Sequence, residues 1–361
     1  MTALAQRTDA INLGQGFPDT DGPGEAIDAA IDALRGGENQ YAPLGGVPPL
    51  REAVLEHQRA YYRLEPEDVL VTFGATEAIA AALLGLVNPG DDVIVLEPYY
   101  DSYTACIAFA GGRRRPVTLR PPEFPLDVDA LDTADRAGAR VMLLNTPHNP
   151  TGRVLDRAEL EAIARVCIEH DIVCVSDEVY EHLVYDGEHI PIATLPGMAG
   201  RTLTVSSVGK SFSFTGWKIG WCSGPAELVA AVRGVKQYLT FAGGTPLQHA
   251  AATALRLPSI HVEALRHDLR AKRDLLCAGL TEAGLHPLIP AGTYFVNADV
   301  GADAIEFCGT LPERCGVVAI PTSAFYDHAD AARTLVRFAF CKREEVIAEA
   351  ARRLAGLAAS E

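Results

Sequence analysis

The sequence predicts an α/β fold with two lobes, a large lobe built on a mostly parallel sheet and a smaller α+β lobe. The first observation is that short β-branched apolar runs alternate with helical stretches from about residue 70 to 225. Such alternation indicates a parallel sheet with helices on both faces. The second is a change after residue 258 to a long charged helix and short strand-like pieces. No repeat or low-complexity linker separates the two regions, so we expect them to be continuous.

Four apolar runs predict the strands of the large lobe, and each ends in a polar residue. They span residues 91–97, 140–145, 172–177 and 202–207. Before the first of them, residues 71–79 run from a strand through a glycine into a helix. Between the second and the third, Asp156 and Glu159 have the spacing of a capping box. We therefore expect a helix there that runs to about His170.

The smaller lobe is predicted from a different pattern. Residues 259–284 form a charged amphipathic helix, strand-like pieces follow at 293–300, 316–321 and 335–340, and a terminal helix begins at about residue 343. We place the boundary between the lobes near residue 245. The segment before about residue 40 is expected to fold back onto the smaller lobe.

Composition and charge exclude several classes of function. The 361 residues carry a net charge of −16 without a long basic run, which argues against a nucleic-acid or anionic-membrane partner. The one basic cluster, at 113–115, is interpreted as a solvated turn. The longest apolar runs, such as 78–87, are too short to span a bilayer. The first residues show no secretory signal, so we expect a cytoplasmic protein.

The eight cysteines lie far apart in the sequence and mostly within apolar segments. They form neither a Cys-x-x-Cys pair nor a Cys/His cluster with the spacing of a zinc site. We interpret them as reduced core residues, and we expect no metal.

Polar residues at strand ends give the first indication of a site. Asn145, Asp177 and Ser207 each end a predicted strand. In parallel sheets, ligands bind at the carboxyl ends of the strands. We therefore expect these three side chains to lie at one edge of the sheet.

Lys210 is the residue that most needs an explanation. It follows a predicted strand and lies among serines and a glycine, where a buried ammonium would be costly. A neutral, partly desolvated lysine amine is a nucleophile that forms a Schiff base with an aldehyde. Asp177 would be a buried carboxylate that needs a cationic partner, such as a protonated ring nitrogen, although an aspartate that caps the next turn is the simpler interpretation.

Two turns supply further candidate hydrogen-bond donors for a ligand. The loop 145–152 holds two asparagines, whose amides can donate to a phenolate without adding charge, although ordinary Asn-Pro turns are common. The amides of Ala75 and Thr76 would point from a helix N-terminus toward an anion such as phosphate. Ser207 and Lys218 could add further phosphate contacts.

Eight ordered motifs resemble the fold-type I pyridoxal-phosphate aminotransferases of class I/II. They cover nearly the whole chain, in the order that this family has. They are GQGFPD (14–19), NQYAPLGGVPPLREAV (39–54), GATEAI (74–79), EPYYDSY (97–103), NTPHNPTG (145–152), SDEVYEHLVYDG (176–187), SSVGKSFSFTGWKIGW (206–221) and VRFAFCK (336–342).

The resemblance implies a role for each cofactor-binding residue. Lys210 would hold pyridoxal 5′-phosphate as a Schiff base and then move the proton between the substrate Cα and the cofactor C4′. Asp177 would pair with the pyridinium nitrogen, Asn149 and Tyr180 would bind the phenolic oxygen, and Tyr100 would stack on the ring. Asn145 is also placed among the cofactor-binding residues. The phosphate contacts would come from Ala75, Thr76, Ser207 and Lys218, together with Tyr41 of the other subunit in a homodimer.

The resemblance also implies how the substrates bind, an amino acid and a 2-oxo acid. Arg337 would hold the α-carboxylate in a bidentate pair, with Gly16 and Asn149 beside it. The bonds Glu97–Pro98 and Asn149–Pro150 are candidates for the cis state. The fold would comprise a large cofactor-binding domain, residues 40–245, around a seven-stranded sheet, and a small domain formed by residues 1–39 and 246–361.

The substrate is less clearly indicated. Residues 236–250, 306–327 and 335–344 look most like N-succinyldiaminopimelate aminotransferases of lysine biosynthesis, with glutamate as the amino donor. A broad kynurenine, glutamine or methionine aminotransferase is the alternative. A cysteine-conjugate β-lyase and an inactive binding protein on the same scaffold are further hypotheses. For a distal substrate carboxylate, Arg113 and Lys236 are the candidate cations.

The beginning of the chain departs from the family pattern. Only ten residues precede Ile11, where the family usually has a longer arm that packs on the partner subunit and covers the substrate. Either this arm is lost or the gene start is shortened, and substrate access and dimer rigidity depend on which of the two holds.

Overall fold

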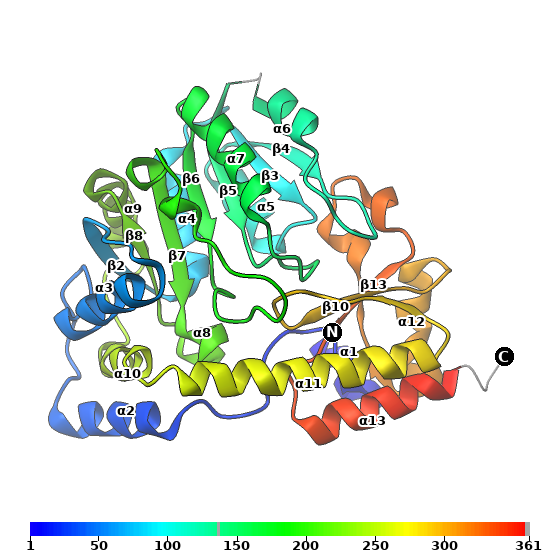
Figure 1. Cartoon of the computed structure of the whole chain (residues 1–361). Helices are drawn as coiled ribbons and strands as arrows, with labels where there is room; N and C mark the ends of the chain where they lie inside the picture. The colour runs from blue at the N-terminus through cyan, green and yellow to red at the C-terminus, as the bar shows by residue number, and fades with distance from the viewer. Residues whose placement is uncertain (136–137, 358–361) are drawn as a thin grey trace.

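A twisted seven-stranded sheet forms the centre of the large lobe (Figure 1). The computed structural model describes residues 1–135 and 138–357. In spatial order the strands are β2 (Asp68–Thr72), β8 (Gly220–Gly224), β7 (Thr202–Ser207), β6 (Val173–Asp177), β5 (Ala139–Asn145), β3 (Asp92–Glu97) and β4 (Arg113–Thr118). The strands from β7 to β4 pair in parallel, whereas β8 runs antiparallel to both of its neighbours. The predicted mostly parallel, seven-stranded sheet is confirmed.

Helices cover both faces of this sheet, as the alternation of strands and helices predicts. One face packs against α4 (Gly74–Leu86), α5 (Asp101–Phe109) and α9 (Ala226–Leu239), and the other against α6 (Val128–Asp135) and α7 (Arg157–Glu169). Strand β3 shows why: Val93 and Val95 belong to the first core and Ile94 and Leu96 to the second. Successive side chains of a strand point to opposite faces, so a strand buried on both sides is apolar throughout.

The predicted capping box is present at the start of α7. The Asp156 side chain accepts from the Glu159 amide, and the Glu159 side chain accepts from the Asp156 amide. The helix ends before His170.

The basic cluster at 113–115 is not a solvated turn, and this expectation was wrong. These residues begin edge strand β4, which pairs with β3 in parallel. Arg113 and Arg115 both contact Asp92, at 2.8 and 2.9 Å, and Arg114 pairs with Asp327 at 3.0 Å. Charged side chains are common on edge strands because they block further strand pairing.

The smaller lobe combines an antiparallel sheet with three helices. The sheet has the order β12 (Ile320–Pro321), β13 (Leu335–Ala339), β10 (Phe295–Asp299) and β9 (His286–Leu288). Its helices are α11 (Ile260–Glu282), α12 (Ala304–Cys315) and α13 (Glu344–Ala355). In Figure 1, α11 runs beneath both lobes, and α13 packs along it. Near the chain start, α1 (Thr2–Thr8) precedes β1 (Ile11–Asn12), which pairs with β11 (Val317–Val318). The expected strand at 316–321 is therefore two short strands in two different sheets.

The remaining helices pack at the β2 side of the large lobe. They are α2 (Gly24–Gly36), α3 (Pro48–Tyr62), α8 (Val208–Ser211) and α10 (Thr245–Leu255). Ala26 of α2 and Ala251 of α10 share a core with Leu50 of α3 and Trp221 of β8. The division into a large domain, residues 40–245, and a small domain, residues 1–39 and 246–361, stays a proposal. The packing described here would assign both α2 and α10 to the large lobe.

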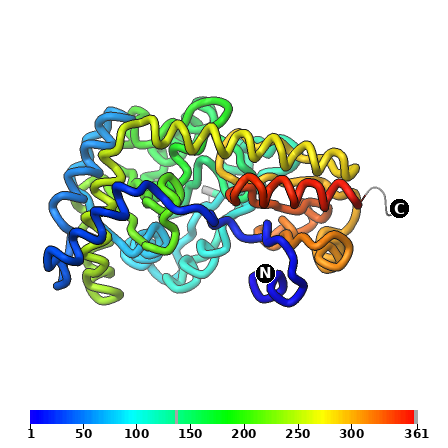
Figure 2. Tube along the Cα trace, turned by 90° about the horizontal axis from the view of Figure 1, so that it is seen from below, coloured from blue at the N-terminus to red at the C-terminus, as the bar shows by residue number. Residues whose placement is uncertain are grey.

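Residues 13–22, here called the crossing segment, connect the lobes near the chain start. Figure 2 shows this part of the chain passing from the smaller lobe to the large lobe. The Leu13 amide donates to Val318 in the smaller lobe, whereas Gly22 lies against Phe212 and Phe214 after α8.

All eight cysteines are free, and seven of them are buried, which confirms their prediction as reduced core residues. No helix within the described ranges has both the length and the apolar character needed to cross a bilayer.

Candidate active site

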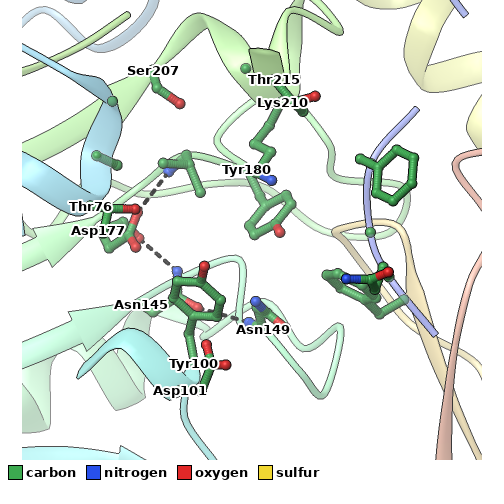
Figure 3. Close-up of a pocket in the computed structure, with 18 of the residues that line it drawn as sticks. Thr76, Tyr100, Asp101, Asn145, Asn149, Asp177, Tyr180, Ser207, Lys210 and Thr215 are labelled. Atoms are coloured by element: carbon green, nitrogen blue, oxygen red, sulfur yellow. Dashed lines mark hydrogen bonds between the residues drawn. The ribbon is translucent and has the colours of Figure 1, made fainter. Parts of the chain in front are cut away.

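A cavity of about 390 Å³ lies between the lobes, at the carboxyl ends of β5, β6 and β7 (Figure 3). It brings together twelve of the thirteen predicted site residues. They are Gly16, Ala75, Thr76, Tyr100, Asn145, Asn149, Asp177, Tyr180, Ser207, Lys210, Lys218 and Arg337. Asn145, Asp177 and Ser207 end their strands as predicted, so the sheet itself sets the position of one wall.

Lys210 extends into this cavity from α8, the short helix that directly follows β7 (Figure 3). Its Nζ lies 5.9 Å from the ring centre of Tyr180 and 5.6 Å from that of Tyr294. Within the described chain no carboxylate forms a salt bridge with it. Burial lowers the pKa of the ammonium, because a low-dielectric site disfavours the charged form. At a given pH, a larger fraction of Lys210 is therefore neutral than of an exposed lysine. A nucleophile or a base needs this neutral amine.

Asp177 lies across the cavity, where its carboxylate has no cation in contact among the described residues. The hydroxyl of Tyr103 donates to its Oδ2 at 2.6 Å, and the Val179 amide donates to its Oδ1 at 3.3 Å. Burial nevertheless raises the pKa of the carboxyl to about 6, with the Tyr103 bond acting in the opposite direction. A positively charged ligand atom next to Asp177 would offset this cost.

The loop after β5 positions Asn149. The backbone N–H of Asn149 donates to Oδ1 of Asn145 at 2.8 Å. Nδ2 of Asn145 in turn donates to the backbone carbonyl of Asp177 at 2.8 Å. The side-chain oxygen of Asn149 accepts from Arg337 at 2.9 Å, which leaves its Nδ2 to donate to a ligand. The Asn149–Pro150 and Glu97–Pro98 bonds are both cis, as the family resemblance implies.

Arg337 on β13 forms the opposite wall of the cavity. Its guanidinium lies between two aromatic rings, 4.1 Å from the centre of Phe295 and 4.4 Å from that of Phe325. Nη2 donates to the Gly14 carbonyl at 3.2 Å, whereas the buried Nε has no partner among the described atoms. Burial lowers its pKa to about 10, so the side chain stays charged at neutral pH. A fixed, partly unpaired guanidinium is suited to a carboxylate ligand.

The N-terminus of α4 supplies the third side of the cavity. The helix begins at Gly74, whose φ is +72°, and its first turn carries Ala75 and Thr76. No side chain caps this helix. Gly220 of β8 lies against it so closely that an added Cβ would be 2.6 Å from the Gly74 carbonyl carbon. With Lys218 and Ser207 also lining the cavity, this corner combines helix amides, a hydroxyl and an ammonium, which suits a phosphate.

Several residues in or beside the cavity were not predicted from the sequence. Tyr103, the donor to Asp177, lies one helical turn after Tyr100, and this spacing was the available signal. Tyr294 donates to the Gly16 carbonyl at 2.7 Å and so holds the crossing segment over the cavity. Phe295 and Phe325, which enclose Arg337, belong to no motif that indicates such contacts.

Tyr41, the thirteenth predicted site residue, and the two candidate cations for a distal carboxylate, Arg113 and Lys236, lie outside the cavity. Tyr41 is 81% exposed, and its ring meets Phe241 edge-on at 5.5 Å. Arg113 starts β4, at the amino end of the sheet, where it pairs with Asp92. Lys236 is buried in α9 and donates to the Phe241 carbonyl. Neither Arg113 nor Lys236 is placed to bind a distal carboxylate of a ligand in this cavity, so that expectation was wrong.

Comparison with known proteins agrees with this geometry. The model of the family "Aminotransferase class I and II" matches residues 8–354. The chain belongs to this family. It is a pyridoxal-phosphate-dependent aminotransferase with the fold of the fold-type I enzymes.

Two curated relatives cover almost all of this aminotransferase. A probable N-succinyldiaminopimelate aminotransferase DapC of Mycobacterium tuberculosis is 52% identical, over 99% of this chain and 95% of the relative. A methionine aminotransferase of Escherichia coli is 42% identical, over 98% of this chain and 94% of the relative.

Solved structures show the same similarity. The N-succinyldiaminopimelate aminotransferase of Mycobacterium tuberculosis superposes with a TM-score of 0.96 at 52% identity, covering 99% of this chain and 96% of that one. A Thermus thermophilus aspartate aminotransferase double mutant gives a TM-score of 0.91 at 36% identity, covering 99% and 95%.

The cavity of this aminotransferase fits its cofactor. Pyridoxal phosphate carries a phosphate, a basic ring nitrogen and an aldehyde. The cavity offers a helix N-terminus, a buried carboxylate that contacts no cation among the described residues, and a desolvated amine.

Proposed function

We propose that this aminotransferase acts in lysine biosynthesis and moves the amino group of glutamate to the 2-oxo acid that corresponds to N-succinyldiaminopimelate. The observation that carries the proposal is the 52% identity to the Mycobacterium tuberculosis enzyme over 99% of the chain. The methionine aminotransferase, at 42%, supports a broad-specificity enzyme as the second candidate.

The chain's residues would hold the cofactor from three sides. The amides of Ala75 and Thr76 with Ser207 and Lys218 would bind the phosphate, Asp177 would pair with the ring nitrogen, and Lys210 would hold the aldehyde carbon. Asn149 and Tyr180 donate to the phenolic oxygen, Asn145 positions Asn149, and Tyr100 covers the ring. When bound, the cofactor delocalises the negative charge that remains after the substrate Cα loses its proton.

The substrate is oriented by Arg337. Its guanidinium pairs with the α-carboxylate, and Gly16 and Asn149 lie beside that pair. This places the substrate amine and Cα toward Lys210. The neutral Lys210 amine would take the proton from the substrate Cα and deliver it to C4′ of the cofactor.

The distal part of the substrate has no obvious cation in this subunit. Within the described chain the cations that line the cavity are Lys210, Lys218 and Arg337, and each already has a role. We therefore propose that the distal carboxylate is bound by neutral donors or by the partner subunit of a homodimer. The same homodimer would bring the partner's Tyr41 to the phosphate. A cytoplasmic location stays a prediction.

A panel of half-reactions tests the substrate. The purified holoenzyme is mixed with N-succinyldiaminopimelate, glutamate, glutamine, methionine or kynurenine, and loss of the visible cofactor absorbance is followed. We expect N-succinyldiaminopimelate and glutamate to react with the highest kcat/KM. Faster reaction with methionine or kynurenine would instead identify a broad aminotransferase. Release of pyruvate from a cysteine conjugate without any 2-oxo acid would identify a β-lyase.

A further inference from the structure

A second group of titratable side chains lies outside the cofactor cavity, between α3 and the segment that follows β6. His57 comes from α3, and Glu181 and His182 directly follow Tyr180. One ligand atom from each of the three lies within 4.8 Å of the others. His57 and Glu181 are buried, and His182 is partly buried. The sequence separates His57 from the other two by more than a hundred residues, so spacing could not indicate the group.

The two imidazoles meet through the nitrogens that commonly bind metals. His57 Nε2 and His182 Nε2 are 2.7 Å apart, so one donates a hydrogen bond to the other. This hydrogen bond requires an unprotonated Nε2 on the accepting ring, and an unprotonated ring nitrogen is what ligates a metal.

Glu181 supplies a buried negative charge that lacks a cation. Ser206 Oγ donates to its Oε1 at 2.6 Å, and no lysine or arginine of the described ranges forms a salt bridge with it. The neighbouring Tyr61, whose ring centre lies 4.7 Å from the centres of both imidazoles, does not provide a positive charge either. A buried carboxylate between neutral groups is costly unless a cation joins it.

We propose that His57, Glu181 and His182 form a binding site for one divalent transition-metal ion such as Zn²⁺. Two imidazole nitrogens and a carboxylate oxygen are a common ligand set for zinc, with water in the fourth position. A tetrahedral ion with bonds of about 2.1 Å needs its two nitrogens about 3.4 Å apart. The two Nε2 atoms must therefore separate by roughly 0.7 Å, and the shared proton moves to Nδ1 of its ring.

His57 also lines a hollow with Glu56, Ala60 and Tyr61, and we expect an ion to enter from this side. The site would link α3 to the segment that carries Tyr180, so bound metal should also stabilise this part of the large lobe.

Crystallography and calorimetry test the proposal on the holoenzyme. Crystals soaked in ZnCl₂ should give an anomalous peak at the zinc edge between His57 Nε2, His182 Nε2 and a Glu181 oxygen. Titration of the chelator-treated, dialysed holoenzyme with ZnCl₂ should show one ion per chain at this site. MgCl₂, which binds imidazole poorly, should give no comparable heat.

Matched variants assign the binding. His57→Gln and His182→Gln should each weaken zinc binding at least ~10-fold, whereas His286→Gln, at an exposed position on β9, should leave it unchanged. The proposal is overturned if wild-type crystals show no peak between the three side chains, or if both variants bind zinc as the wild type does. The diffraction experiment uses the wild type and decides the question even where a variant fails to fold.

Discussion

At the scale of single residues, the cavity contains more buried charge than the chain itself neutralises. Asp177 and Arg337 are buried and Lys210 is partly buried, yet the described residues give none of them an ion-pair partner. Unpaired buried charges cost several kcal/mol in an empty site. Each of them therefore indicates that a bound ligand supplies a group of opposite charge or a group that reacts with the side chain.

Arg337 gives the first prediction. We expect Arg337→Ala to weaken binding of every 2-amino and 2-oxo acid by ~10–100-fold, since it removes a charge-assisted pair. The visible absorbance of the bound cofactor should remain, because Arg337 faces the substrate side. Rapid-mixing titrations give the apparent Kd for each acid. Unchanged apparent Kd values for all acids would show that another residue holds the carboxylate.

Asp177 gives a prediction about pH. Its pKa of about 6 in the folded chain lies above the value of about 4 for an unfolded aspartate. The folded chain therefore binds the extra proton between these pH values, and the stability of the cofactor-free protein falls by ~3 kcal/mol as pH rises from about 4 to 6. Asp177→Asn should remove this loss and be more stable than the wild type at pH 7.

Urea unfolding of the cofactor-free protein at pH 4 and pH 7 measures this difference, with Asp330→Asn as an exposed control. A variant that is less stable than the wild type at pH 7 would contradict the argument. With cofactor the sign reverses, because Asp177→Asn loses the partner of the ring nitrogen and should bind the cofactor more weakly.

The sequence identified these charged residues but not the groups around them. Asp177 and Lys210 follow apolar strands, and this position is visible in the pattern. The bond from Tyr103 to Asp177 and the two rings around Arg337 depend on how separate elements meet. Such contacts have no local signature, so only the folded chain reveals them.

At the scale of elements, the apolar strands of the parallel sheet were predictable, whereas edge strand β4 was not. Strands β3, β5, β6 and β7 are apolar because both faces of the sheet are covered. Edge strand β4 begins with three arginines, whose acidic partners Asp92 and Asp327 lie elsewhere in the sequence. Composition alone could not distinguish it from a loop.

The capping box of α7 gives a prediction at this scale. Asp156→Ala should lower the free energy of unfolding by about 1 kcal/mol, because the Glu159 amide loses its acceptor. Asp156→Asn keeps an acceptor at the same position and serves as the control. Urea unfolding of the holoenzyme measures both. An equal loss in the two variants would assign the effect to charge rather than to capping.

At the scale of the whole molecule, the exposed Tyr41 is the predicted cofactor-binding residue that has no role within a single subunit. Its side chain is largely exposed and lies outside the cavity. A homodimer in which it reaches the partner's phosphate would explain this position. Sedimentation should then give twice the chain mass of 38.5 kDa, about 77 kDa.

Mixed dimers test the shared site. Lys210→Ala alone should lose both the visible cofactor band and transamination. Tyr41→Phe alone should bind the cofactor ~10-fold more weakly, through loss of one hydrogen bond to a charged group. After the two are unfolded and refolded together, half of the dimers should contain one complete site and restore roughly a quarter of wild-type activity at low cofactor concentration. Activity equal to the sum of the separate variants would place each site within one subunit.

The crossing segment has a consequence for how the enzyme is made. The contacts at its start are with residues near the other end of the chain: Leu13 with Val318 and Ala339, and Gly14 with Arg337. A ribosome releases the amino end first, so residues 13–22 leave the exit tunnel long before their partners exist. A nascent chain would therefore hold the sheet, Lys210 and the phosphate corner while the carboxylate-binding wall was still untranslated, and it would become an aminotransferase only after β13 had emerged.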